Sequence, residues 1–312
     1  MRAWRLWWIA IGPALSLSST GCSASEATVL DDSEARVPGV EQGGDEDVDD
    51  VAAPRAVTVR FRAQVGDATF ACGQRYATSG ANAAWLTPVD LRFFVRDVRL
   101  LAAGGAEVPL VLEARAPWQL EDVALIDFED ASGACASGTP DVNVELTGHA
   151  PPGDYVGLSF ENGVPEAANH ADPATQPPPL QAGSMHWGWL LGYRFLMAEV
   201  AGDGDAGERL GSALFHLGST GCSGAPASGG ISCDRQNRNR VRLDGFDPDA
   251  DEVVVDVLGL FDGIDLRAVT TCHSGGGEEC APFFERAGID AADGSPRQEQ
   301  ALYRAAPLRG EP

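Results

Sequence analysis

Residues 90–101 read DLRFFVRDVRLL, and polar and apolar side chains alternate along much of this stretch. A period of two is typical of a β-strand that turns one face toward a core. The same period recurs along the chain, with clusters of Gly, Pro, Asp and Asn between the stretches that carry it. These stretches are AVTVRFRAQV (56–65), EVPLVLEA (107–114), VNVELTGH (142–149), DYVGLSF (154–160), GWLLGYRFLMAEV (188–200), ERLGSALFHLG (208–218), RVRLDGF (240–246) and EVVVDVLGL (252–260).

Many short strands with turn signals between them, and no sustained helical period, predict an all-β fold. We expect an antiparallel β-sandwich or barrel-like domain with long loops, braced by disulfides. PFFERAG (282–288) is the one segment for which we expect a short helix, and ADPATQPPPLQAGS (171–184) is a proline-rich loop.

The first residues, MRAWRLWWIAIGPALSLSSTGC, place two arginines before a short apolar run and small residues before Cys22. This layout predicts a secretory signal peptide of the lipoprotein type over residues 1–21, because the apolar run is too short for a transmembrane helix. We expect lipidation of Cys22, with ordinary cleavage nearby as the alternative. Ser23 fits sorting to the outer membrane, so the predicted location is the periplasm or cell surface.

Residues 22–54 are acidic and poor in aromatic side chains, which predicts a flexible tether. Residues 55–312 are then expected to form a single domain. The formal charge is −24 and the sequence pI is about 4.4, and all basic side chains other than histidine are arginine. Such a surface repels nucleic acid, which excludes nucleic-acid binding.

Six cysteines remain after Cys22, and an even number in an exported chain favours disulfides over metal ligation. Spacing alone does not select among the possible pairings. Short loops favour Cys222–Cys233 and Cys272–Cys280, which leaves Cys72–Cys135. The absence of a CxxC motif argues against a zinc knuckle or a thioredoxin-type site.

Enzyme signatures such as GxSxG, HExxH, a P-loop or GxGxxG after a strand are absent, so we expect a protein that is not an enzyme. The carboxylates of Asp127, Glu129 and Asp130 have a pattern that suits calcium. A turn with a solvated acidic face is the favoured alternative.

Residues 184–195, SMHWGWLLGYRF, concentrate soft and oxidisable side chains. Continuous strand alternation predicts that Met185, Trp187, Trp189 and Tyr193 share one face, which favours a core strand, and that His186 points to the other. Because the motif begins where a loop meets a strand, a binding site is the alternative.

The histidines are candidate metal ligands, although a structural role is the usual one for each taken alone. His170 lies in a loop flanked by Asn169 and Asp172, and the side chain of either residue could orient the imidazole. His216 lies at a strand end, on the face opposite Phe215. His149 and His273 are assigned structural or surface roles.

Seven segments, in order along nearly the whole predicted domain, resemble the MbnP-like family, also described as a metallo-mystery-pair four-cysteine family, and its WxW branch in particular. The segments are FRAQVGDATFACGQRY (61–76), PVDLRFFVRDVRL (88–100), PWQLEDVALIDFEDASGACASGT (117–139), GDYVGLSFENGVPEAANHAD (153–172), MHWGWLLGYRFL (185–196), FHLGSTGC (215–222) and CHSGGGEECAPFF (272–284).

The resemblance implies copper binding outside the cytoplasm, in partnership with a dihaem cytochrome c peroxidase-like protein of the MbnH/MauG-like kind. In that family the partner oxidises a tryptophan to kynurenine, whose amine binds copper with histidine imidazoles. Carried over to this chain, the ligands are His170, His216 and Trp187 as kynurenine, with Met185 as a soft neighbour. Trp187 and Trp189 become candidates for oxidation or for electron relay.

The sequence therefore predicts an exported copper-binding protein, with a role in copper handling, that a haem partner modifies. A disulfide-braced β-sandwich lipoprotein that binds a partner without metal is the alternative, with the WGW segment as core or docking surface.

Overall fold

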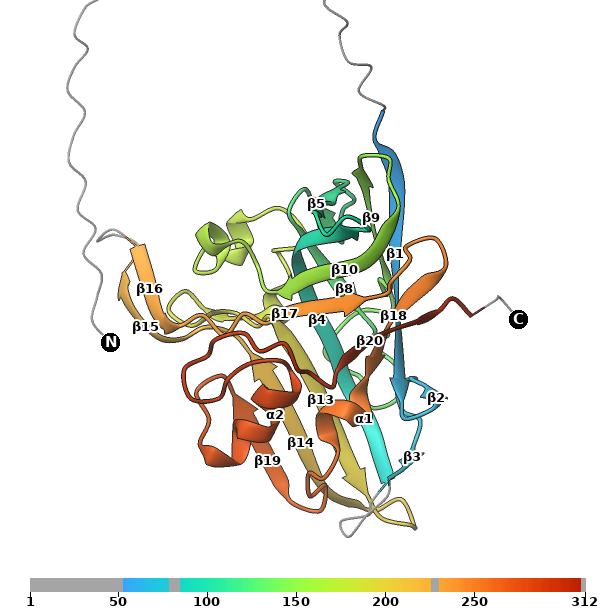
Figure 1. Cartoon of the computed structure of the whole chain (residues 1–312). Helices are drawn as coiled ribbons and strands as arrows, with labels where there is room; N and C mark the ends of the chain where they lie inside the picture. The colour runs from blue at the N-terminus through green and yellow to red at the C-terminus, as the bar shows by residue number, and fades with distance from the viewer. Residues whose placement is uncertain (1–52, 79–84, 226–229, 310–312) are drawn as a thin grey trace, which may run out of the picture. The chain divides into compact units, whose positions relative to one another are not determined.

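The computed structural model describes residues 53–78, 85–225 and 230–309. The predicted signal peptide, the lipidation of Cys22 and nearly all of the tether lie outside these residues and stay predictions. Two β-sheets pack against each other (Figure 1), which confirms the predicted all-β sandwich. No helix in the described part of the chain is long and apolar enough to cross a membrane.

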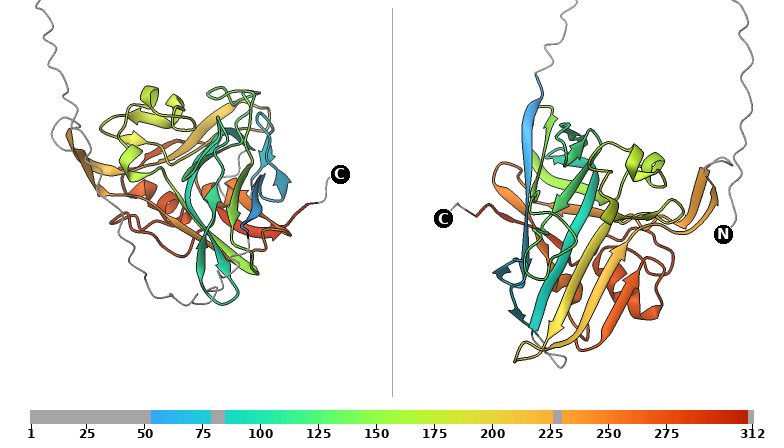
Figure 2. Two further views of the ribbon diagram at one scale, coloured as in Figure 1. Left: turned by 90° about the horizontal axis from the view of Figure 1, so that it is seen from above. Right: turned by 180° about the vertical axis from the view of Figure 1, so that it is seen from behind.

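The larger sheet has ten strands and is built around the long strand β4, which contains the stretch DLRFFVRDVRLL. Along its main path the order is β17-β10-β4-β13-β14-β19, and the view from behind in Figure 2 shows β4, β13, β14 and β19 side by side. Its strands are β3 (Tyr76–Ala77), β4 (Trp85–Ala102), β5 (Glu107–Pro109), β7 (Gln119–Leu120), β8 (Val123–Asp127), β10 (Tyr155–Asn162), β13 (Leu196–Asp203), β14 (Arg209–Leu217), β17 (Arg240–Asp244) and β19 (Val269–His273).

The smaller sheet has six strands in the order β20-β18-β1-β9-β6, with β2 paired to β1. Two further ribbons stand apart from these sheets, β11–β12 and β15–β16. The remaining elements are β1 (Arg55–Val65), β2 (Ala68–Thr69), β6 (Val111–Leu112), β9 (Glu145–Ala150), β11 (His186–Gly188), β12 (Gly192–Tyr193), β15 (Thr220–Ala225), β16 (Gly230–Arg235), β18 (Asp251–Asp256), β20 (Tyr303–Pro307), the helices α1 (Val257–Phe261) and α2 (Ala281–Arg286), and the 3₁₀ turns η1 (Glu166–Ala168), η2 (Pro173–Thr175), η3 (Gly183–Met185) and η5 (Glu278–Cys280).

The core between the sheets is aromatic. The ring of Phe93 on β4 lies 5.8 Å from that of Phe61 and 5.5 Å from that of Tyr303, both on the smaller sheet. On the opposite face of β4, Phe94 meets Tyr193 edge-on at 5.7 Å. Because both faces of the larger sheet are covered here, the nearby polar residues Asp90 and Arg92 of β4 are buried along with the apolar ones.

The single strand predicted over residues 188–200 is wrong. The chain instead forms the short hairpin β11–β12 and then begins β13 at Leu196. Gly188 (φ 145°) and Gly192 (φ 77°) adopt backbone conformations that favour glycine, so the chain reverses between them. The hairpin leaves Trp189 51% exposed, whereas continuous alternation would have buried it.

Two other predicted strands are divided. The stretch 252–260 ends as a strand at Asp256, whose carboxylate accepts the backbone N–H of Leu258 and of Gly259 and so begins α1. The stretch 107–114 splits into β5, which pairs with β4, and β6, which pairs with β9 in the other sheet. The predicted helix near residue 282 is confirmed as α2.

Three disulfides brace this fold. Cys72–Cys135, Cys222–Cys233 and Cys272–Cys280 are all formed, as the loop lengths favoured. Disulfides of this number fit an exported protein.

Candidate metal centre

Two histidines lie side by side at one end of the larger sheet. β14 and β19 run parallel, and their register pairs His216 with His273. Their ring centroids are 4.9 Å apart. Phe215, one residue before His216, stacks on Phe283 of α2 at 5.5 Å on the other face of the sheet. Strand alternation therefore turns both imidazoles away from α2, as predicted for His216.

His216 is held by a carboxylate. Its Nε2 lies 2.7 Å from Oε1 of Glu199 on the neighbouring strand β13, and a carboxylate can only accept, so Nε2 carries the proton. The same hydrogen bond is the main reason that the pKa of Glu199 lies below its ordinary value, and burial opposes it. His216 is 5% exposed, and its Nδ1 atom is buried without a hydrogen-bond partner. A neutral imidazole in this tautomer presents a lone pair at Nδ1.

His273 supplies a second imidazole beside that of His216. Partial burial is the main cause that lowers the pKa of His273, and the charges of His216 and Arg194 lower it further. A ring that resists protonation keeps its lone pair for a ligand. His273 belongs to the edge strand β19 and is exposed, so the cluster is reached from solvent on this side.

Trp187 covers the two histidines. The centroid of its ring lies 6.3 Å from that of the His216 ring. The rings of Trp187 and His273 meet edge-on, with their centroids 5.9 Å apart. The Arg194 guanidinium lies over the indole, with Cζ 5.2 Å from the ring centroid. Gly218 leaves the space that this ring occupies, because a Cβ there would lie 2.6 Å from an atom of the indole. The indole is half-buried, so solvent and a partner can reach it.

Of the two methionines in the described chain, Met197 lies beside His216 across neighbouring strands, in line with His273. Met197 on β13 pairs with His216, so their side chains emerge on the same face of the sheet. Met185, which we expected near the metal, is fully buried. Its backbone carbonyl accepts the N–H of Arg194, which closes the base of the hairpin.

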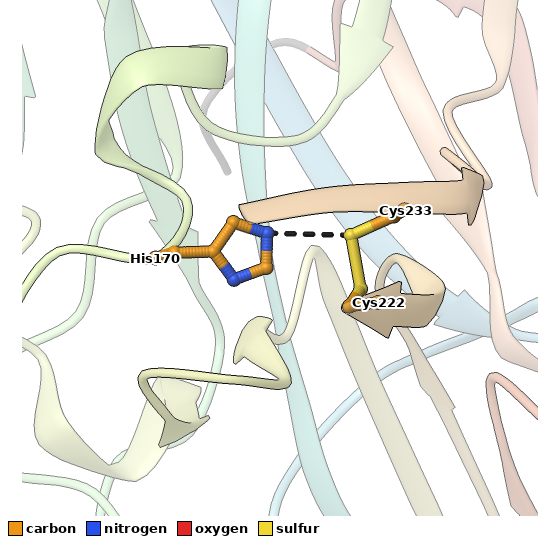
Figure 3. Close-up of side chains that lie close together, drawn as sticks. All are labelled: His170, Cys222 and Cys233. Atoms are coloured by element: carbon orange, nitrogen blue, oxygen red, sulfur yellow. Dashed lines mark hydrogen bonds between the residues drawn. A yellow bond between two sulfur atoms is a disulfide. The ribbon is translucent and has the colours of Figure 1, made fainter. Parts of the chain in front are cut away.

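His170 lies in a different place from the Trp187–His216–His273 cluster. Its Nδ1 is 2.9 Å from the carbonyl oxygen of Trp189, and its Nε2 is 3.3 Å from Sγ of Cys233 (Figure 3). Asn169 lies 3.2 Å from Nε2 through its amide nitrogen, and orients the ring as expected. The predicted set of ligands is thus divided, with His216 and Trp187 together and His170 at the neighbouring disulfide.

The remaining two histidines, His186 and His149, each contact a residue outside the Trp187–His216–His273 cluster. His186 meets Tyr193 at 4.7 Å, and burial is the main cause that lowers its pKa. His149 lies on the surface 3.5 Å from Glu113, which agrees with the surface role assigned to it.

The carboxylates considered for calcium form turns. Asp127, Glu129 and Asp130 each accept the backbone N–H of the residue two positions on. Among the described residues, the group of potential ligand atoms that gathers within 4.8 Å is that of His170, Cys222 and Cys233 instead. Since these cysteines are joined in a disulfide, the oxidised protein offers only an imidazole there.

His273 is the site residue that the sequence analysis missed. It faces His216 only because β14 and β19 pair in parallel across more than fifty residues of chain, a contact that periodicity cannot reveal. The available signal was the segment CHSGGGEECAPFF (272–284), which carries the resemblance and contains this histidine.

A β-sandwich braced by three disulfides fits an exported protein, and two imidazoles and an indole gathered at one end of a sheet make a candidate centre for a soft or borderline metal. The MbnP family model matches residues 54–274, and the chain belongs to the MbnP family. This confirms the resemblance, and membership associates the chain with copper handling.

A solved structure supports the same assignment. MbnP from Methylosinus trichosporium is similar to this chain with a TM-score of 0.71 and 29% sequence identity, over 82% of this chain and 100% of that one. No curated protein matches the chain. The family match includes Trp187 and His216 and ends one residue beyond His273.

Proposed function

We propose that this chain is an exported copper-binding protein whose centre comprises Trp187, His216 and His273, with Trp187 completed as a ligand by an external haem oxidant. The observation that carries the proposal is the Nδ1 atom of His216, which is buried and unpartnered while Glu199 fixes Nε2. Carboxylates commonly orient metal-bound imidazoles in this way. Imidazole suits copper, and the nearby thioether of Met197 suits its reduced form.

Oxidation of Trp187 supplies the third donor. Addition of two oxygen atoms breaks the C2–C3 bond of the indole, and hydrolysis then releases formate and leaves the aryl amine of kynurenine. The described chain contains no cofactor motif for this reaction, so the oxidant is a peroxide-fed haem protein, in which each peroxide delivers one oxygen atom and is reduced to water. The chain is then a substrate of its partner and not an enzyme.

Copper measurement in matched variants tests the centre. Wild-type protein co-expressed with the haem partner is expected to bind one copper ion per chain, whereas His216→Gln and His273→Ala are expected to lose it. His149→Ala is the matched control, since His149 also contacts a carboxylate but lies on the surface. A wild type that binds no copper, or ligand variants that keep full occupancy, would contradict the proposal.

Intact-mass analysis tests the oxidation separately. Co-expression with the haem partner is expected to replace one carbon by one oxygen in the mass of the chain. Trp187→Phe should abolish this change, and Trp118→Phe should not. The same mass change in Trp187→Phe would transfer the reaction to another tryptophan.

The second candidate function is a protein-binding module without metal. It is favoured by the apolar tip of the β11–β12 hairpin, where Trp189, Leu190 and Leu191 are 51%, 36% and 50% exposed. Partner binding by a chain that takes up no copper would support this candidate over the first.

A further inference from the structure

We propose that Cys222 and Cys233, once reduced, form with His170 a second metal site, specific for a soft ion such as Cu(I) and opened by thiol–disulfide exchange. The choice of copper rests on the proposed function, whereas the site itself rests on the three side chains shown in Figure 3.

The imidazole is already arranged as a ligand. The Trp189 carbonyl can only accept, so Nδ1 of His170 carries the proton and donates it over 2.9 Å. The other ring nitrogen, Nε2, therefore presents its lone pair, and the amide of Asn169 donates to it at 3.2 Å. This same Nε2 lies 3.3 Å from Sγ of Cys233. Asn169 also donates to Oγ of Ser219 at 3.2 Å, so its amide stays bonded if a metal replaces it at Nε2.

The two sulfurs stay close after reduction, because the ribbon that carries them is held by its own backbone ladder. Cys222 and Cys233 are directly opposite each other on β15 and β16, with Cα atoms 3.9 Å apart and register pairs on both sides. With the disulfide formed, the two sulfurs and the imidazole nitrogen lie within 4.8 Å of one another, and the paired strands keep the two thiolates beside the imidazole after reduction. Thiolate and imidazole donors in this number match the low coordination that Cu(I) accepts.

Exposure makes this disulfide the accessible one. Both of its cysteines are half-buried on a ribbon that projects beyond the two sheets in Figure 1. Cys272 and Cys280 are fully buried, and in the third disulfide Cys72 is half-buried but its partner Cys135 is 1% exposed, so only Cys222–Cys233 has both of its cysteines half-buried. An external dithiol therefore attacks the Cys222–Cys233 bond in preference to the other two.

The chemistry balances with a dithiol as reductant. The dithiol gives two electrons and two protons, the Cys222–Cys233 bond breaks, and the dithiol leaves as its own disulfide. Binding of Cu(I) then displaces the two thiol protons. An external disulfide that accepts two electrons from the two thiolates is itself reduced to a dithiol, re-forms the Cys222–Cys233 bond and releases the ion. The redox state of the surroundings therefore sets the occupancy of this site.

Thiol counting and Cu(I) titration test the proposal on the folded protein. After mild reduction with a phosphine and its removal without oxygen, we expect two more titratable thiols per chain and one more bound Cu(I) than in the oxidised protein. X-ray absorption should show sulfur neighbours around the added copper. The increment should persist in a His273→Ala background, which separates this site from the Trp187–His216–His273 centre.

Matched variants identify the ligands. Cys222→Ser/Cys233→Ser should abolish both increments and keep the copper content of the oxidised protein. His170→Gln should keep the thiols and weaken the added Cu(I) by at least about tenfold, since loss of an outer partner alone has effects of that size. Failure of the thiols to appear without denaturant, thiols without added copper, or an increment that survives the double substitution would each overturn the proposal.

Discussion

Glu199 orients the imidazole of His216, the proposed metal ligand. Its carboxylate holds Nε2 of His216 at 2.7 Å and leaves Nδ1 free. Glu199→Gln keeps the size of the side chain but removes its charge, so we expect copper affinity to fall about tenfold. A competition titration with a copper chelator measures this change. Glu113→Gln, beside the surface His149, is the matched control and should leave the affinity unchanged.

Asp127 is a second residue with a testable electrostatic role. Burial is the main cause that raises its pKa to about 7, while the amide of Glu129 and the charge of Arg92 oppose the rise. The folded protein thus keeps this proton at pH values where the unfolded chain, with its ordinary pKa of 3.8, has lost it. Stability therefore falls as the pH rises from 3.8 through about 7.

Asp127→Asn removes this dependence. We expect the variant to be more stable than wild type by on the order of 2–4 kcal/mol at about pH 8, and close to wild type at about pH 4. Denaturant unfolding at both pH values measures the difference. Asp130→Asn, in the same turn, is the control. A variant that is less stable than wild type at the higher pH would show that the carboxylate is held in its charged form.

At the scale of single residues, the sequence indicated which side chains could bind a metal, but not which other side chains lie beside them in the fold. Both His170 and His216 were chosen as ligands through the family resemblance, and alternation separately turned His216 away from Phe215. Asn169 does orient the ring of His170, but toward a disulfide. Met197 could not be preferred over Met185 without the β13–β14 register.

Among the elements, the β11–β12 hairpin decides where the indole lies. Trp187 fits over the histidines only because Gly218 has no side chain. A Cβ at this position would lie 2.6 Å from the indole and 2.6 Å from the backbone oxygen of Tyr193. The backbone oxygen of Tyr193 cannot move without moving the chain that carries it, so Gly218→Ala must displace the hairpin.

We expect Gly218→Ala to cost about 1–3 kcal/mol of stability, the usual range for overpacking, and to weaken copper binding because Trp187 moves away from His216. Thermal unfolding measures the stability, near-ultraviolet circular dichroism reports the displacement of Trp187, and competition with a copper chelator measures the affinity. Gly183→Ala is the control, since a Cβ there meets nothing within 4 Å. Equal behaviour of the two variants would mean that the hairpin accommodates the methyl group without moving.

The same hairpin shows why periodicity failed here and succeeded elsewhere. β1 and β14 follow their predicted ranges because each keeps one periodicity from end to end. In residues 188–200 the turn occupies only the few residues between Gly188 and Gly192, and its apolar tip continues the alternation of a strand. The two glycines were the only local signal of the reversal, and a strand tolerates isolated glycines.

On the scale of the whole molecule, the spacing of the cysteines predicted long-range contacts better than the pattern of the strands did. Short loops favoured Cys222–Cys233 and Cys272–Cys280, which left Cys72–Cys135, and these three disulfides are formed. The parallel pairings β1–β18 and β14–β19 join segments far apart in the chain, and the second of them builds the centre. Such contacts depend on the packing of the complete sandwich, so the pair His216–His273 could not be derived from local pattern.

The surface of the described residues also predicts where the proposed haem partner would dock. Most exposed apolar side chains of the described chain stand alone or in alternate positions, but Trp189, Leu190 and Leu191 form a continuous tip on the hairpin that carries Trp187. A continuous apolar tip beside Trp187, the residue proposed to be oxidised, is suited to contact with a partner. The rest of the chain is acidic, with a formal charge of −24, so we expect the contact to be assisted by basic groups on the partner.

Leu190→Ser/Leu191→Ser is therefore expected to lower kcat/KM for partner-driven oxidation of Trp187 by about tenfold, since central apolar anchors are commonly worth at least about 1 kcal/mol each. Copper affinity of chains that already carry the oxidised residue should stay unchanged. Added salt should slow the reaction of wild type and variant alike, because it screens the charges and not the apolar tip. Val111→Ser, a 60% exposed position on the smaller sheet, is the control. If the tip variant is oxidised as fast as this control, the partner reaches Trp187 from another direction.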